Sequence, residues 1–157
     1  FFIQRMSEVT QVTPLTRDLK EENDEGSEGD VAIAIPAGIE VYEVFGSLFF
    51  GAVDQFTESL RSMTSKPRIF ILETKNLLAI DASGLRALES LAEELTRQGT
   101  QFFISGIHKQ PLFAIEQSGF LYKIGEEHVF GSLGEALEKA RIAIEQAKLE
   151  KNRKKIE

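Results

Sequence analysis

Runs of apolar residues, some continuous and some alternating with polar residues, divide the chain into short strands. Val31–Ile35 ends at Pro36, and Ile39–Phe45 follows with alternating apolar and polar positions, so the two runs predict a β-hairpin with a short turn. Arg68–Glu73 and Gln101–Ile107 are short apolar runs, typical of parallel strands that are covered on both faces. The pattern therefore predicts a mixed sheet with an antiparallel part near the N-terminus and parallel strands at its centre.

Other apolar residues recur at the spacing of amphipathic helices. This spacing predicts a first helix over Val53–Met63, a second over Leu85–Leu95 and a final one over Leu133–Ile144. Ser132, with Glu135 one turn later, forms a capping box at the start of the final helix. Three long helices are thus expected, each with one apolar face.

The remaining elements are short, and together with the others they define the fold class. Pro111 opens a helix over Leu112–Ser118, and a last edge strand is expected at Tyr122–Ile124 or His128–Phe130. Strands that alternate with helices indicate the α/β class, and 157 residues suffice for one ordinary core. We therefore predict a single α/β domain: a mixed sheet with an N-terminal β-hairpin, central parallel strands and about four to five helices.

Charge is distributed unevenly along the chain. The formal net charge is -7, but residues 18–30 alone carry seven acids against one lysine, so the rest of the chain is almost neutral. This acidic segment lacks large apolar residues and is predicted to be a flexible insert. The last ten residues, 148–157, form a basic tail with five cations and two acids. A nearly neutral body gives no reason to expect a nucleic-acid partner.

The N-terminal residues differ from the rest of the chain. Phe1–Ile3 is an apolar stub, and Arg5 follows it, as at the cytoplasmic end of a transmembrane helix. We therefore assign residues 1–17 to the end of a last transmembrane helix and a linker or first segment. The acidic insert at 18–30, the main domain at 31–147 and the basic tail at 148–157 complete the predicted organisation.

The strongest functional signal lies where an apolar run meets the second helix. Asp81, Ala82, Ser83 and Gly84 occupy this turn, and a helix start carries free N–H groups and partial positive charge. Asp81 and Ser83 are preferred capping residues, and capping alone would explain them. A loop after a parallel strand is also a frequent docking site, so a surface or switch role for this turn is the competing interpretation.

Residues that would carry catalysis are mostly lacking. The chain has no cysteine, no P-loop and no Gly-x-Gly-x-x-Gly string, and the glycines of a nucleophile elbow do not flank Ser83. His108 and His128 lack the spacing of a zinc site, so no metal or cofactor is expected. His108 follows a strand at the same sheet edge as Asp81, but we interpret it as a polar loop residue. The protein is thus predicted not to be an enzyme.

A second unusual string, Gly46–Gly51, places Leu48, Phe49 and Phe50 where a polar loop is expected. Packing on the core is the simpler interpretation. If part of the string is exposed, it forms a hydrophobic docking patch of Leu48, Phe49 and Phe50.

The string Ile80–Leu85, between a strand and the second helix, resembles the signature loop of STAS domains, which occur in sulfate transporters and anti-sigma factor antagonists. The order of the predicted strands and helices is similar over most of the chain. Arg5–Thr10 and Gly46–Gly51 resemble the SulP branch of anion transporters in particular. The resemblance implies the STAS fold, and a regulatory or protein-interaction domain that acts through the loop from Asp81 to Gly84.

The same resemblance implies a location and partners. The domain would lie at the cytoplasmic face of the inner or plasma membrane and contact the transmembrane domain of the same polypeptide, which transports a sulfate-like anion. A regulatory protein or kinase and a homodimer formed through the full transporter are further implied partners. The family also allows weak nucleotide binding, but the sequence shows no phosphate cradle beyond the helix start, so no cofactor is assigned.

Two alternatives remain. In anti-sigma factor antagonists the serine that matches Ser83 is phosphorylated by a partner kinase, so the chain could be a free antagonist that is switched in this way. Ala82 stands where antagonists usually carry a second hydroxyl residue, which argues against that switch. The third and least favoured alternative is a small hydrolase or phosphotransfer enzyme that uses Ser83, Asp81 and His108.

Overall fold

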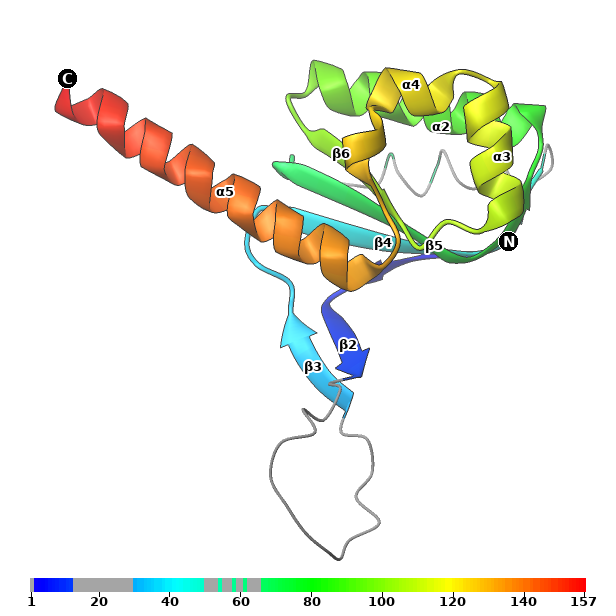
Figure 1. Cartoon of the computed structure of the whole chain (residues 1–157), viewed down its shortest axis with the longest axis horizontal. Helices are drawn as coiled ribbons and strands as arrows, with labels where there is room; N and C mark the ends of the chain where they lie inside the picture. The colour runs from blue at the N-terminus through cyan, green and yellow to red at the C-terminus, as the bar shows by residue number, and fades with distance from the viewer. Residues whose placement is uncertain (1, 13–29, 50–53, 55–57, 59–60, 62–65) are drawn as a thin grey trace, which may run out of the picture.

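A five-stranded mixed sheet between two layers of helices forms the body of the protein in the computed structural model (Figure 1). The structure describes residues 2–12, 30–49, 54, 58, 61 and 66–157. The elements of the main sheet follow the order β1-β4-β5-β6-β7. The strands are β1 (Phe2–Met6), β2 (Glu8–Val12), β3 (Asp30–Ala34), β4 (Ile39–Leu48), β5 (Ile69–Ile80), β6 (Gln101–Ser105) and β7 (Val129–Phe130). The helices are α2 (Ala82–Arg97), α3 (Lys109–Gln117), α4 (Phe120–Ile124) and α5 (Leu133–Ile156), with a short 3-10 turn at Glu126–His128.

The sheet has parallel strands at its centre and one antiparallel edge. β4, β5, β6 and β7 pair in parallel, and β1 pairs with β4 in antiparallel orientation. Helices α2, α3 and α4 cover one face, while α5 crosses the other (Figure 1). The predicted α/β class and mixed sheet are confirmed.

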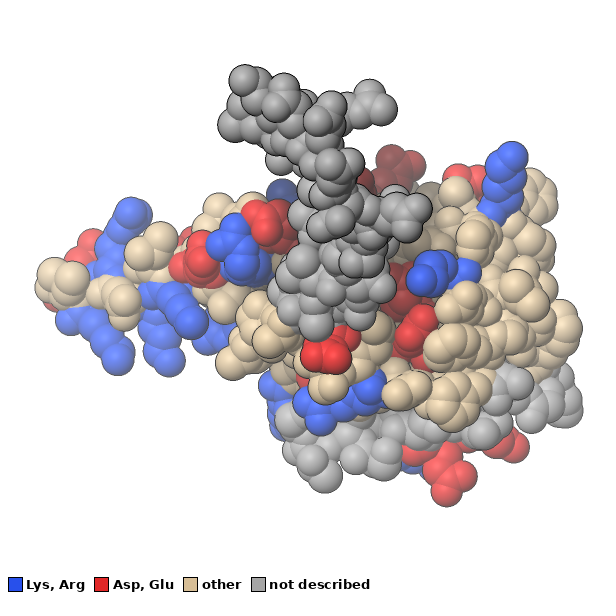
Figure 2. Space-filling model, turned by 90° about the horizontal axis from the view of Figure 1, so that it is seen from below, with Lys and Arg blue, Asp and Glu red and all other residues tan. Residues whose placement is uncertain are grey.

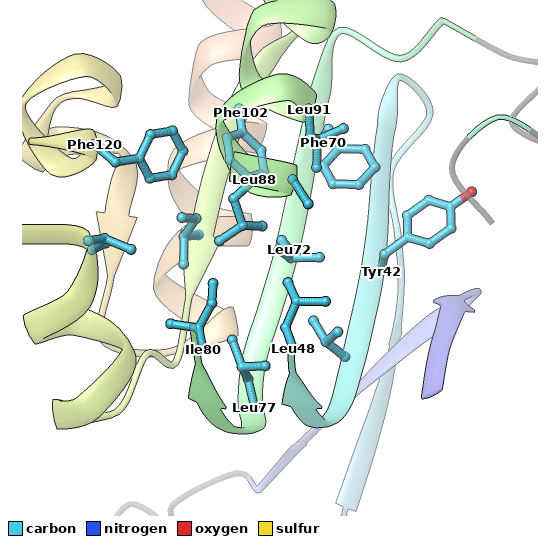
Figure 3. Packing of buried hydrophobic residues seen from close by; sticks show 14 of the residues in the cluster. Tyr42, Leu48, Phe70, Leu72, Leu77, Ile80, Leu88, Leu91, Phe102 and Phe120 are labelled. Carbon is cyan, nitrogen blue, oxygen red and sulfur yellow. The ribbon is translucent and has the colours of Figure 1, made fainter. Parts of the chain in front are cut away.

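Two apolar cores hold these layers together. The larger core lies between the sheet and α2 to α4, where Tyr42 stacks on Phe70 with ring centroids 5.2 Å apart (Figure 3). The smaller core lies under α5 and includes Ile71 from β5 and Ala140 from the helix. Alternate residues of the central strands thus point to opposite layers, as expected for strands that are covered on both faces.

The predicted pairing of Val31–Ile35 with Ile39–Phe45 in one hairpin is wrong, although an antiparallel pair of strands does form near the N-terminus. β3 pairs with β2 in a separate two-stranded sheet, and the edge of β4 is occupied by β1, with Ile3 opposite Val44. Between β3 and β4 the chain turns at Pro36, whose carbonyl accepts the N–H of Ile39 at 3.2 Å, without bringing the two strands together. Two runs that are close in sequence suggested a hairpin, but a more distant strand with a similar alternation forms the ladder.

Residues 2–6, within the predicted N-terminal segment 1–17, form the edge strand β1. Their alternation places Ile3 against the larger core, while Gln4 and Arg5 are exposed. Residues 8–12 continue as β2. No helix among the described residues combines the length and the apolar character that crossing a bilayer requires.

Three other predictions concern the first helix, the acidic insert and the C-terminal end of the chain. Most of the predicted first helix lies outside the described residues; Asp54, Glu58 and Arg61 are helical and exposed, as its polar positions should be. The predicted acidic insert also lies outside them, apart from Asp30, which begins β3. At the other end, the basic tail is the last part of α5, and the Ser132 cap is confirmed because its Oγ accepts the N–H of Glu135 at 3.2 Å.

Candidate functional site

The carboxyl ends of β4 and β5 meet beside the start of α2. Leu48 and Ile80 are paired in the ladder, and the N–H of Asp81 donates to the carbonyl of Leu48 at 3.2 Å. Helix α2 begins at the next residue, Ala82. The loop singled out in the sequence therefore lies at the end of the sheet, where parallel strands in α/β proteins place their binding loops.

Asp81 is the N-cap of α2. Its Oδ1 accepts the N–H of Gly84 at 2.9 Å, which satisfies one of the free donors of the first turn. Ala82 is exposed and Ser83 is partly exposed. The Ser83 hydroxyl makes no hydrogen bond to any described residue, so the capping role expected of both side chains belongs to Asp81.

Gly84 is buried at a position where a side chain would collide with its neighbours. A Cβ at this position would lie 2.3 Å from the carbonyl oxygen of Leu48 and 2.7 Å from Cγ1 of Ile80. Both distances are far below van der Waals contact, and one of the two atoms belongs to the backbone. The glycine therefore lets the first turn of α2 press against the ends of β4 and β5, and this contact determines where Ser83 is presented.

The structure divides the predicted docking patch. Leu48 is only 1% exposed and belongs to the larger core, so its assignment to a docking patch is wrong. Its position beside Leu77 and Ile80 at the strand ends is visible in Figure 3. Phe49 is 47% exposed, and Phe50 lies outside the described residues.

Helix α3 is tied to the same strand end by hydrogen bonds that the sequence did not reveal. The amide of Gln110 accepts from the N–H of Ile80 at 3.1 Å and donates to the carbonyl of Ile80 at 3.4 Å. Nε2 of His108, the residue before α3, donates to the carbonyl of Lys75 at 2.5 Å. His108 is thus engaged with the backbone of β5, as expected of a loop residue. The signal that was missed is a polar side chain in the first turn of a helix that follows a strand.

Two further exposed apolar side chains belong to these elements. Leu78 on β5 is 69% exposed and Phe113 on α3 is 60% exposed. Together with Phe49, they place an apolar residue on each of three segments that meet at, or are tied to, this end of the sheet. We call Phe49, Leu78 and Phe113 the apolar rim. Contiguous patches of such side chains mark contact surfaces, whereas single exposed ones are common.

A buried carboxylate lies further down the central strand. Glu73 is 4% exposed; its Oε1 accepts the N–H of Lys75 at 2.8 Å and its Oε2 accepts the hydroxyl of Ser105 at 3.2 Å. Burial raises the pKa of Glu73, the two hydrogen bonds and the charge of Lys75 oppose the shift, and the neighbouring Glu43 adds to it. The carbonyl of Lys75 also accepts the hydrogen bond from Nε2 of His108, the residue before α3. Glu73 and the start of α3 are therefore both hydrogen-bonded to the backbone of Lys75.

Replacing Glu73 with glutamine should stabilise the domain in a pH-dependent way. A carboxyl group with a raised pKa binds more protons in the folded chain, so its contribution to stability falls as the pH rises through the interval between its unfolded and folded pKa values. We expect Glu73→Gln to raise the melting temperature at roughly pH 8, and to change it little at about pH 4, where both states are largely protonated. Glu93→Gln, at an exposed position of α2, is the control. An equal effect of Glu73→Gln at both pH values would contradict the prediction.

Other features of the surface lie apart from the loop. A groove of about 770 Å³ is lined by the C-terminal half of α2 together with Phe102, Phe120 and Lys123, and contains none of the residues from Asp81 to Gly84. Within residues 2–12, 30–49 and 66–157, no three His, Asp or Glu side chains are grouped as a metal site would require. The loop offers a partly exposed side-chain hydroxyl and a helix start, outside this groove.

The fold and the loop identify the class of protein. The model of the STAS domain family matches residues 30–136, and the chain belongs to this family. It is 28% identical over 131 residues to the putative sulfate transporter YvdB of Bacillus subtilis, in a match that covers 83% of this chain and 23% of that protein. The chain thus spans about a quarter of this relative's length.

Solved structures agree with this assignment. A sulfate transporter family protein from Wolinella succinogenes has a TM-score of 0.67 and 34% identity, with 71% of this chain and 92% of that chain covered. The STAS domain of a SulP transporter from Vibrio cholerae has a TM-score of 0.64 and 27% identity, with coverages of 73% and 89%. An anti-sigma factor antagonist from Mycobacterium paratuberculosis, at 14% identity and a TM-score of 0.59, shares the fold. The chain is therefore a STAS domain of the kind found in sulfate transporter-like proteins.

Proposed function

We propose that this chain is the cytoplasmic regulatory and protein-interaction domain of a SulP-type transporter of sulfate-like anions, and that it acts by docking and not by catalysis. The relatives named as sulfate transporters support this function, since the chain matches about a quarter of YvdB and leaves room for a transport part. The partner that we propose first is the transmembrane domain of the same polypeptide. A homodimer would then form through the full transporter.

The observation that carries the proposal is that the residues of the loop have different roles. Asp81 caps α2, Gly84 packs against Leu48, and Ser83 is left partly exposed with a hydroxyl that bonds to none of the described residues. The apolar rim provides contact area on neighbouring elements. The loop is held by the capping hydrogen bond of Asp81 and by the close packing of Gly84, and Ser83 between them is partly exposed, which suits a docking site.

The alternative is a free anti-sigma factor antagonist that is released from its partner by phosphorylation of Ser83. The exposure of Ser83 supports this alternative too, and a phosphate at a helix start is electrostatically favourable. Arg86, one turn further along α2, is exposed and could pair with the phosphate. Ala82 and the transporter relatives favour the first proposal.

The proposal is tested by introducing a negative charge into the loop. Ser83→Glu should change anion uptake by the full-length transporter severalfold, because the charge would enter the proposed contact surface. The melting temperature of the isolated chain should stay within about 2 °C, since a helix start tolerates negative charge and surface changes cost little.

Ser90→Glu is the matched control, because Ser90 is an exposed serine of the same helix, away from its start. Uptake that responds equally to both substitutions, or to neither, would argue against docking through the loop. Uptake that is unaffected while Ser83→Glu releases a soluble kinase-like partner would favour the antagonist.

A further inference from the structure

Helix α5 continues well beyond the body of the protein. Its first half packs on the sheet through Ala136, Leu137, Ala140 and Ile144. From Lys148 to Glu157 every residue is exposed, and this end of the helix projects past the sheet (Figure 1). Because this segment packs on none of the described elements, a partner surface would add to the stability of its helix.

The charges of α5 change in character where the helix leaves the sheet. In the packed half, Arg141 is paired with Glu138 at 2.6 Å and with Glu145 at 2.9 Å. Residues 148–157 carry five cations and two acids, and none of them forms an ion pair with a described residue. Figure 2 shows these Lys and Arg side chains gathered on the projecting end. We call residues 148–157 the basic end of α5.

Apolar side chains interrupt this charge on one face. Leu149 is 67% exposed and Ile156 is 87% exposed. Seven residues correspond to almost two helical turns, so both side chains project from the same face. By the same geometry Lys151 and Lys155 lie toward the far side of the helix, Lys148 lies at the flank, about 100° from Leu149, and Arg153 lies on the side of the apolar pair. The basic end thus carries both of its apolar side chains on one side and most of its lysines away from that side.

We propose that the basic end of α5 binds the surface of a bilayer that contains anionic lipids. Leu149 and Ile156 would enter the headgroup boundary, and the lysine ammonium groups would reach the lipid phosphates along their flexible stems. The charge of this segment is complementary to an anionic surface, and the relatives are named as sulfate transporters. A nucleic acid would use the cations but would leave the two apolar side chains exposed. This contact goes beyond the proposed docking of the Asp81–Gly84 loop.

The experiment measures vesicle binding by the 157-residue chain. Sedimentation with vesicles of phosphatidylcholine alone is compared with sedimentation with vesicles that also contain phosphatidylglycerol. We expect binding only to the second kind, and a decrease as the salt concentration rises. The triple variant Lys148→Gln, Lys151→Gln, Lys155→Gln should weaken binding about a hundredfold, or about fivefold for each cation removed. The matched control neutralises three exposed lysines elsewhere, Lys109, Lys123 and Lys139, and should bind like the original chain.

A second variant separates lipid binding from general attraction to anions. Leu149→Ser combined with Ile156→Ser keeps the net charge, and should weaken vesicle binding about tenfold or more while leaving binding to single-stranded DNA unchanged. Equal binding to neutral vesicles, equal loss in the control, or no effect of the serine variant would overturn the proposal. A concentration-dependent dimer that this variant abolishes would instead assign the apolar face to a second copy of the chain. Because no transport is measured, the outcome is independent of the Ser83 test.

Discussion

Replacing Gly84 with alanine is expected to destabilise the domain by about 3 kcal/mol, the upper end of the usual cost of overpacking. The added methyl group would lie 2.3 Å from the carbonyl oxygen of Leu48, 2.7 Å from Cγ1 of Ile80 and 2.9 Å from Cγ of Leu48. A side chain could move aside, but the Leu48 carbonyl also accepts the N–H of Asp81. Relief of the clash would therefore move the start of α2 away from β4 and weaken this hydrogen bond.

The measurement is urea unfolding of the isolated chain, and Gly131→Ala is the control. A Cβ at Gly131 would have its nearest neighbour at 3.6 Å, an ordinary contact with the side chain of Glu135. This control should stay within about 0.5 kcal/mol of the original protein. If Gly84→Ala were equally mild, the close contact between α2 and β4 would not be needed for the fold, and the packing role of Gly84 would be refuted.

Replacing Leu48 with alanine should cost about 3 kcal/mol in stability, as is usual for a buried leucine. Leu48 is 1% exposed and packs in the larger core near Leu77 and Ile80. Phe49→Ala should leave the free energy of unfolding almost unchanged, because 47% of Phe49 is exposed. The two adjacent residues should therefore affect different measurements: Leu48 the stability of the domain, and Phe49 its contact with a partner.

Both variants are compared by thermal unfolding of the chain and by anion uptake of the full-length transporter. We expect Phe49→Ala to change the rate of anion uptake while the amount of transporter stays the same. Leu48→Ala should lower the amount of folded protein. A loss of stability in Phe49→Ala similar to that in Leu48→Ala would show that Phe49 is a core residue. Phe113→Ala, another member of the apolar rim, should behave like Phe49→Ala.

The sequence predicted the centre of the fold better than its edges. Arg68–Glu73 and Gln101–Ile107 are recognisable as buried strands because both faces of such strands are apolar. The end of β5 was missed, since Lys75 and Asn76 break the apolar run while the ladder with β4 continues to Ile80. The short apolar stub before Arg5 did not predict β1, because so short a run is compatible with a strand and with the end of a helix.

The candidate site was also predicted in part. Asp81 was recognisable as a cap because the preference for acids at this position is a local property of the backbone. The different roles of Ser83, Gly84 and Leu48 could not be recognised from the sequence, since they depend on how closely α2 approaches β4. The role of Gln110 was not predictable from the sequence because its hydrogen-bond partner, Ile80, lies thirty residues away in the chain.

The sequence by itself determined the α/β class, the helix starts at Asp81 and Ser132 and the location of the basic end, because hydrophobic periodicity, capping and charge are properties of neighbouring residues. Only the tertiary structure decided which strand pairs with β4, that Leu48 is buried while Phe49 is exposed, and that α5 leaves the sheet after its first half. Strand pairing and burial depend on contacts between distant segments, and many partners with the same alternation satisfy the local pattern equally well.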